Sequence, residues 1–96
     1  LDEENFFLVG FGFWGREILK YLTVIDKLDR LAGIIDNNTT LMGLNVCKKE
    51  IISMTDSLNS RHNHYLLSVQ KKEIRMSLEK QIYELNKKCQ ICSIWE

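Results

Sequence analysis

The sequence predicts a three-layer α/β domain in which helices cover both faces of a short, open parallel sheet. Short apolar runs alternate along the chain with segments whose apolar residues recur every three or four positions, a pattern typical of parallel sheets with helical crossovers. The 96 residues also suffice for one hydrophobic core but not for two. We therefore expect a single domain over residues 1–96, with its strands in the order 2-1-3-4.

Four segments have the composition of buried strands. The first, Phe6–Val9, is a short apolar run without alternation that stops at Gly10, as expected of a central parallel strand buried on both faces. The second ends in Asp36, which is followed by two asparagines, residues that favour turns. The four predicted strands cover residues 6–9, 31–36, 64–69 and 90–94, with the last at the edge of the sheet.

Apolar residues at helical spacing mark the segments between these strands. In residues 15–27 they recur at positions 18, 19, 22 and 25, which lie on one face of a helix. In residues 71–85 the successive spacings are four, four and three, which again predicts a helix. The other segments are expected to form a short helix over residues 48–57, an extended arm over 41–46 and a polar loop over 56–63.

Three glycines follow the first predicted strand in the stretch "GFGFWG". Gly10 permits a tight turn, Gly12 lets a phosphate approach the backbone, and Gly15 lets the helix pack close to the strand. The start of the helix offers unpaired amides and a partial positive charge to an anion, and Arg16 can add a side-chain contact. A glycine loop between a strand and a helix favours binding of a nucleotide diphosphate.

An acidic residue stands where such a nucleotide would present its ribose. Asp36 closes the second predicted strand about 20 residues after the glycines, where a carboxylate can accept hydrogen bonds from a ribose diol. Phe13 and Trp14 are unusually large for this loop, and Trp14 either stacks on a base or sugar or anchors a partner surface. The predicted ligand-binding residues are Gly10, Gly12, Phe13, Trp14, Gly15, Arg16, Asp36 and Asn37.

The same residues also have an interpretation without a ligand. Glycines at a strand-to-helix corner can be retained for packing alone, and an aspartate followed by two asparagines can cap the end of a strand. In that case the rings of Phe11, Phe13 and Trp14 form an apolar patch for a partner protein or a second copy of the chain.

Charged residues balance in this chain, with 13 basic and 13 acidic side chains. A chain without a basic surplus has no broad field to neutralise phosphates, so we expect no nucleic-acid partner. No apolar run approaches the length of a membrane span, and residues 1–4 lack the basic head of a signal peptide, so a cytoplasmic location is expected. The chain starts at Leu1 rather than methionine and ends directly after an apolar segment, which predicts a fragment of a longer protein.

No group of residues has the composition of a catalytic centre, because the sequence suggests neither a nucleophile with its base nor paired carboxylates. Cys89 and Cys92 would project to opposite faces of a strand, which disfavours a shared metal ion. Glu73 and Arg75 lie in the first turns of the helix over residues 71–85, where a solvated face is expected and a position toward the crevice is the alternative. We therefore expect no catalytic and no metal-binding residue, and a domain that binds rather than catalyses.

Several stretches together carry a family resemblance: "FFLVGFGFWGREIL", "LAGIIDNN", a later Gly-x-x-Val at residues 43–46, and "YLLSV" followed by a helix with Arg75. They resemble the small Rossmann-like domain at the N-terminus of bacterial sugar O- and N-acyltransferases and of related enzymes of surface-polysaccharide biosynthesis. The resemblance implies that a nucleotide-sugar is held by Gly10, Gly12, Gly15, Asp36 and Asn37.

The chain is also similar to the NADH-sensing domain of Rex-family repressors and to the first half of NAD-dependent dehydrogenases, which use the same glycine loop. Our first hypothesis is a module that holds a nucleotide-sugar or dinucleotide for a larger bacterial enzyme of glycan biosynthesis. The alternatives are the NAD(H)-binding half of an oxidoreductase or redox sensor, and a ligand-free Rossmann-like interaction domain. The expected partners are a nucleotide ligand, a further domain of the same polypeptide and, for the interaction domain, a second copy of the chain.

Overall fold

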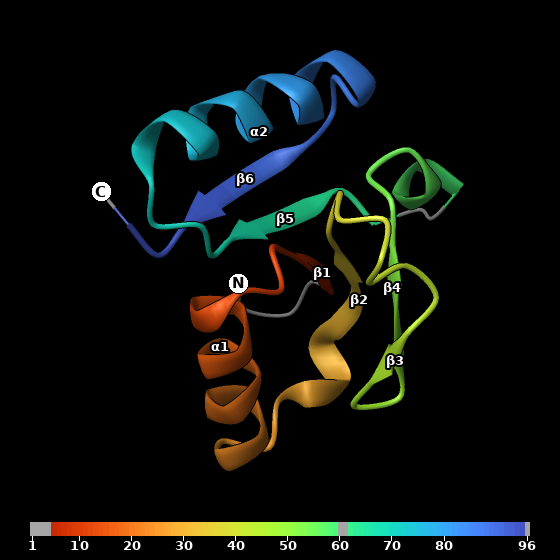
Figure 1. Cartoon of the computed structure of the whole chain (residues 1–96), viewed down its shortest axis with the longest axis vertical. Helices are drawn as coiled ribbons and strands as arrows, with labels where there is room; N and C mark the ends of the chain where they lie inside the picture. The colour runs from red at the N-terminus through yellow and green to blue at the C-terminus, as the bar shows by residue number, and fades with distance from the viewer. Residues whose placement is uncertain (1–4, 60–61, 96) are drawn as a thin grey trace.

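The computed structural model describes residues 5–59 and 62–95, which form a six-stranded sheet with one α-helix on each face (Figure 1). The strands are β1 (Phe6–Val9), β2 (Leu31–Ile35), β3 (Asn45–Val46), β4 (Lys49–Ile52), β5 (His64–Leu67) and β6 (Gln90–Ser93). The helices are α1 (Phe13–Val24) and α2 (Lys72–Leu85), together with the 3-10 helices η1 (Leu28–Arg30) and η2 (Asp56–Asn59). The predicted three-layer α/β fold is confirmed.

The strands follow the order β3-β4-β2-β1-β5-β6 across the sheet. The predicted order 2-1-3-4 recurs within it as β2-β1-β5-β6, and these neighbours are all parallel. β5, for example, runs in register with β1 from His64 opposite Phe6 to Leu67 opposite Val9. Parallel pairing brings the carboxyl ends of β1, β2 and β5 to one edge, so the segments that follow these strands lie close together.

β4 and β3 extend the sheet beyond β2 and differ from the expectation. Ile51 of β4 pairs in parallel with Ile34 of β2, and β3 forms an antiparallel hairpin with β4. The helix expected over residues 48–57 is therefore wrong, and the arm expected over 41–46 is a turn followed by β3. The reason is burial on both faces, because Ile51 packs on the α1 side of the sheet and Ile52 on the α2 side.

The hydrophobic core has two halves, one on each face of the sheet. Leu19 and Leu22 of α1 cover one half, and Ile82 of α2 covers the other. Successive residues of Phe6–Val9 alternate between the halves, and each is at most 2% exposed. This burial explains why the first strand shows no polar alternation in sequence.

α1 starts earlier than the sequence suggests. Its first residue is Phe13 rather than Gly15, because Gly12 takes an extended N-cap conformation with φ −91° and ψ −155°. It ends before the expected residue 27, because Asp26 has a left-handed φ of 58° that stops the helix. Both large aromatic residues of the glycine motif therefore lie in the first helical turn.

The later elements agree closely with the expected ranges, since α2 and β6 fall within residues 71–85 and 90–94. The expected loop over residues 56–63 contains η2, and residues 60 and 61 lie outside the described part. Residues 1–4, on which the expected absence of a signal peptide rests, also lie outside it. Within the described residues, no helix is both long and apolar enough to cross a membrane.

Candidate functional site

The predicted site residues gather at the carboxyl edge of the sheet, where three segments are joined by backbone hydrogen bonds. The Gly10 amide donates to the carbonyl of Ile35 at the end of β2 (2.8 Å), and the Ser68 amide donates to the carbonyl of Val9 at the end of β1 (3.1 Å). The glycine loop, the segment after β2 and the segment after β5 thus form one contiguous surface.

Two of the three glycines are required by the fold itself. Gly10 has φ +100°, and a Cβ there would lie 2.9 Å from the Ser68 Oγ. A Cβ on Gly15 would collide with the carbonyl oxygen of Gly10, where the helix passes close to the end of β1. Whatever binds at the loop, these two positions exclude a side chain.

Gly12 has no such reason within the described structure. Its φ of −91° suits any residue, and a Cβ there would meet no described atom within 4 Å. Gly12 is the N-cap of α1, and the helix start has neither a side-chain cap nor an acidic residue in its first turn. The first amides of α1 therefore have no capping side chain, and an anion placed beside them would be stabilised by hydrogen bonds and by the helix dipole.

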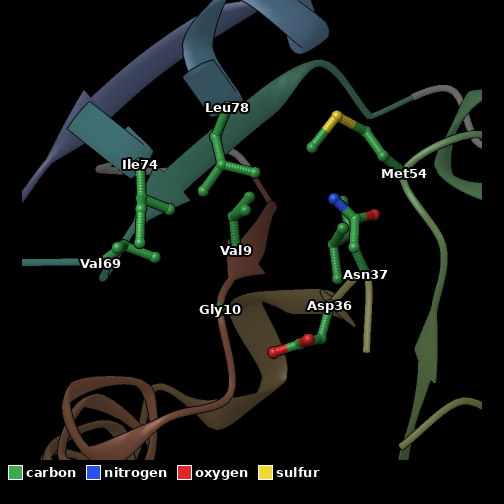
Figure 2. A pocket seen from close by; sticks show the side chains of 9 residues that line it. Val9, Gly10, Asp36, Asn37, Met54, Val69, Ile74 and Leu78 are labelled. Carbon is green, nitrogen blue, oxygen red and sulfur yellow. The ribbon is translucent and has the colours of Figure 1, made fainter. Parts of the chain in front are cut away.

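Asp36 organises the glycine loop. Its Oδ2 accepts a hydrogen bond from the Phe11 amide (2.8 Å), and its Oδ1 accepts one from the Asn38 amide (2.8 Å). Figure 2 shows the carboxylate pointing toward the chain that follows Gly10. A carboxylate has about four lone-pair sites, so Asp36 keeps acceptor capacity for a further donor. Sequence reasoning missed this loop-fixing role, which no local pattern signals.

Ser68 and Arg75 support the loop from the β5 side. Ser68 is buried, and its hydroxyl hydrogen is shared between the carbonyl oxygens of Val9 and Gly10, each 3.0 Å from Oγ. Arg75 is also buried, and its guanidinium donates to the carbonyl of Gln70 (2.7 Å). The expectation of a solvated Arg75 is wrong, because this side chain satisfies carbonyls of the segment between β5 and α2.

The large aromatic residues of the loop form a cluster with the end of the described chain. The Trp14 Nε1 donates to the Gln70 Oε1 (3.2 Å), and the Trp14 ring makes edge-to-face contacts with Phe13 and Trp95. Phe13 is 66% exposed and Trp14 37% exposed. The Arg16 guanidinium lies 5.3 Å from the centre of the Phe11 ring. Self-association through these rings stays a prediction.

Two hollows flank the glycine loop, and Gly10 and Val69 line both of them. The first holds about 190 Å³ (Figure 2) and is lined by Val9, Gly10, Ile35, Asp36, Asn37, Met54, Val69, Ile74 and Leu78. The second holds about 200 Å³ and is lined by Gly10, Gly12, Phe13, Trp14, Gly15, Ser68, Val69 and Gln70. Seven of the eight predicted residues therefore line one crevice, and Arg16 lines neither hollow.

The cysteines lie apart from this crevice. Cys89 is buried against the α2 side of the sheet, and burial raises the pKa of its thiol above the usual 9.0. Cys92 is exposed. Within residues 5–59 and 62–95, no group of three histidine, cysteine or acidic side chains is suited to a metal ion.

Comparison with known proteins adds a structural relationship but no sequence family. No protein-family model and no curated protein matches the chain. Similar solved structures include the Rex-family repressor RSP (TM-score 0.69, 19% identity) and RSP in complex with β-NADH (0.68, 18%). A third is RSP in complex with β-NAD+ and operator DNA (0.69, 19%). Each match covers 96% of this chain but only 45%, 45% and 43% of the other, so the chain spans less than half their length.

These comparisons leave one expectation without support and overturn another. None of them supports the resemblance to sugar acyltransferases or a role in polysaccharide biosynthesis. The exclusion of nucleic acid as a partner is wrong, because a chain with this fold is a repressor that binds operator DNA. RSP is more than twice as long as this chain, so the charge balance of these 96 residues cannot exclude a partner that RSP binds. What the likeness shows is the fold: this chain is a Rossmann-like α/β domain similar to part of a Rex-family repressor.

Proposed function

We propose that this domain binds a nicotinamide dinucleotide, NAD(H), across the carboxyl edge of its sheet, as the ligand-binding part of a longer, redox-responsive protein. The observation that carries the proposal is Gly12. The fold explains the glycines at positions 10 and 15 but leaves position 12 unexplained, at the one place where a diphosphate would need a bare backbone.

The two hollows suit the two halves of such a ligand. The diphosphate lies against the first amides of α1, between the hollows that meet at Gly10. The adenine enters the first hollow between apolar side chains, and its ribose hydroxyls donate to the free lone pairs of Asp36 or to Asn37. The other half of the dinucleotide lies in the second hollow, beside Phe13 and Trp14.

The walls of the second hollow favour a dinucleotide over a nucleotide-sugar. Phe13 and Trp14 present aromatic surface, and the side-chain oxygen of Gln70 is already bonded to Trp14. A sugar buried there would need partners for several hydroxyl groups, whereas a flat nicotinamide ring gains from aromatic contact. The structures of RSP with β-NADH and β-NAD+ also support this choice.

Binding rather than catalysis is favoured by the residues around the crevice. Among the described residues that line the two hollows, Asp36 is the single ionisable side chain, and its carboxylate already accepts two amides. Reaction chemistry would need further acid or base groups. A cytoplasmic location belongs to this proposal, since nicotinamide dinucleotides are cytoplasmic metabolites.

The test is a titration of the 96-residue chain with NADH, NAD+, ADP-ribose and a UDP-sugar, followed by amide chemical shifts. We expect NADH and ADP-ribose to shift the amides of residues 10–15 in a saturable way, and the UDP-sugar to bind more weakly. If millimolar NADH moves none of these amides, the proposal is wrong. A UDP-sugar that binds more tightly than NADH would instead support the nucleotide-sugar hypothesis.

A further inference from the structure

A third hollow continues the first one along α2 and has different chemistry. It holds about 380 Å³ and shares Asn37 and Met54 with the first hollow. Figure 2 shows the Asn37 side chain pointing toward Met54 at this boundary. The lining of the third hollow is Asn37, Ser53, Met54, Thr55, Gln81, Glu84 and Leu85. The crevice thus changes from apolar walls to walls of amides, hydroxyls and one carboxylate.

One face of α2 forms part of the wall of the first and third hollows. Ile74 and Leu78 line the first hollow, and Gln81 and Glu84, in the following turns, line the third. Residues three or four apart lie on the same side of a helix, so the α2 sequence itself sets this change from apolar to polar. A flat ring inserted between the apolar residues would have its outer edge near Gln81 and Glu84.

These two side chains offer hydrogen-bond acceptors to that edge. An ionised carboxylate accepts but does not donate, and Glu84 forms no ion pair with any residue in the described part of the chain. Among the described residues, only the Asn37 Nδ2 donates a hydrogen bond to the Gln81 Oε1, at the long distance of 3.5 Å. A ligand with a hydrogen-bond donor at this place would find unused acceptors.

We infer that Gln81 and Glu84 select the base of the bound nucleotide by accepting a hydrogen bond from the exocyclic amino group of adenine. The inference rests on the proposed function, since it requires adenine in the first hollow. It adds a specificity element on α2, outside the glycine loop and the segment after β2. A base without a donor at this edge does not form this hydrogen bond and binds less tightly.

The experiment compares NADH with its analogue in which purine replaces adenine, so that only the amino group is missing. Affinities are measured by calorimetry on the 96-residue chain and on the variants Glu84→Leu, Gln81→Leu and Glu79→Leu. We expect the analogue to bind about five- to tenfold more weakly than NADH. The ratio falls toward one in Glu84→Leu and Gln81→Leu. It is unchanged in Glu79→Leu, a matched change at a residue of α2 that lines neither the first nor the third hollow.

The outcomes separate this inference from the function on which it rests. Equal affinities for NADH and the purine analogue would overturn base selection and leave dinucleotide binding intact. If NADH still binds more tightly than the purine analogue, by the same ratio, in both Gln81→Leu and Glu84→Leu, the assignment to these residues is overturned. If neither ligand binds, the proposed function fails and the inference fails with it.

Discussion

Replacing Gly12 by aspartate should stabilise the fold and abolish most ligand binding, two effects of opposite sign from one side chain. Gly12 is the N-cap of α1, its backbone conformation suits any residue, and a Cβ there meets no described atom within 4 Å. Aspartate is a better N-cap than glycine and adds a favourable charge at the positive end of the helix dipole. We expect Gly12→Asp to raise the free energy of unfolding by about 0.5–1 kcal/mol.

The same carboxylate would repel a bound diphosphate. If the ligand lies against the first amides of α1, like charges would stand about 5 Å apart, which corresponds to about 3 kcal/mol at an effective dielectric constant of about 20. The expected loss of NADH affinity is about a hundredfold. Gly12→Asn is the matched control, because it provides a similar cap without the charge, and its affinity should lie between those of Gly12→Asp and the unchanged chain.

Urea unfolding measures the stability change, and energy transfer from tryptophan to NADH measures the affinity. Unchanged NADH binding by Gly12→Asp would refute the position of the diphosphate. A loss of stability greater than about 1 kcal/mol would show that Gly12 serves the fold after all, and the main support for the proposed function would then be gone.

Four further predictions test the fold and the site. Gly15→Ala should destabilise the chain by more than about 2 kcal/mol in urea unfolding, because its Cβ collides with backbone; a neutral effect would contradict the close passage of α1 over β1. Lys48→Gly should stabilise it by about 1 kcal/mol, because Lys48 has φ 66° in the β3–β4 turn; destabilisation would favour the helix that the sequence suggested there. Trp14→Leu should weaken NADH binding several-fold, measured by calorimetry, but leave ADP binding unchanged. An equal loss of affinity for NADH and ADP would argue against the second hollow as the site of the nicotinamide. The free energy of unfolding should fall as the pH rises above about 9, because burial raises the pKa of the folded Cys89 thiol and this thiol then ionises only in the unfolded chain. Cys89→Ala should reduce this pH dependence in urea unfolding at pH 8 and 10. The same pH dependence in the variant would contradict the reasoning.

The sequence predicted most of the fold because its strongest signals come from burial on both faces of a parallel sheet. The run Phe6–Val9 and the helical spacing in α2 leave few alternatives. The sequence did not predict β4, because two consecutive isoleucines are compatible with a short helix as well as with a strand. The contact that decides, the pairing of Ile51 with Ile34, is not local in sequence.

The site could be predicted in its residue types but not in its hydrogen bonds. The glycine spacing and Asp36 identified the crevice, yet the bond from the Phe11 amide to Asp36 joins residues 25 positions apart. Burial of Arg75 likewise depends on the path of the segment after β5. The error about nucleic acid has another cause, since the charge balance of these 96 residues says nothing about the partners of a structural neighbour more than twice as long.

The measurement that tests the central claim most directly is the amide spectrum of the 96-residue chain during addition of NADH. We expect saturable shifts at Gly12, Phe13 and Trp14, where the start of α1 meets the diphosphate, together with shifts at Asn37 in the first hollow. Amides at the start of α1 that stay fixed through millimolar NADH would contradict it, and the loop would then be a glycine corner kept for packing alone.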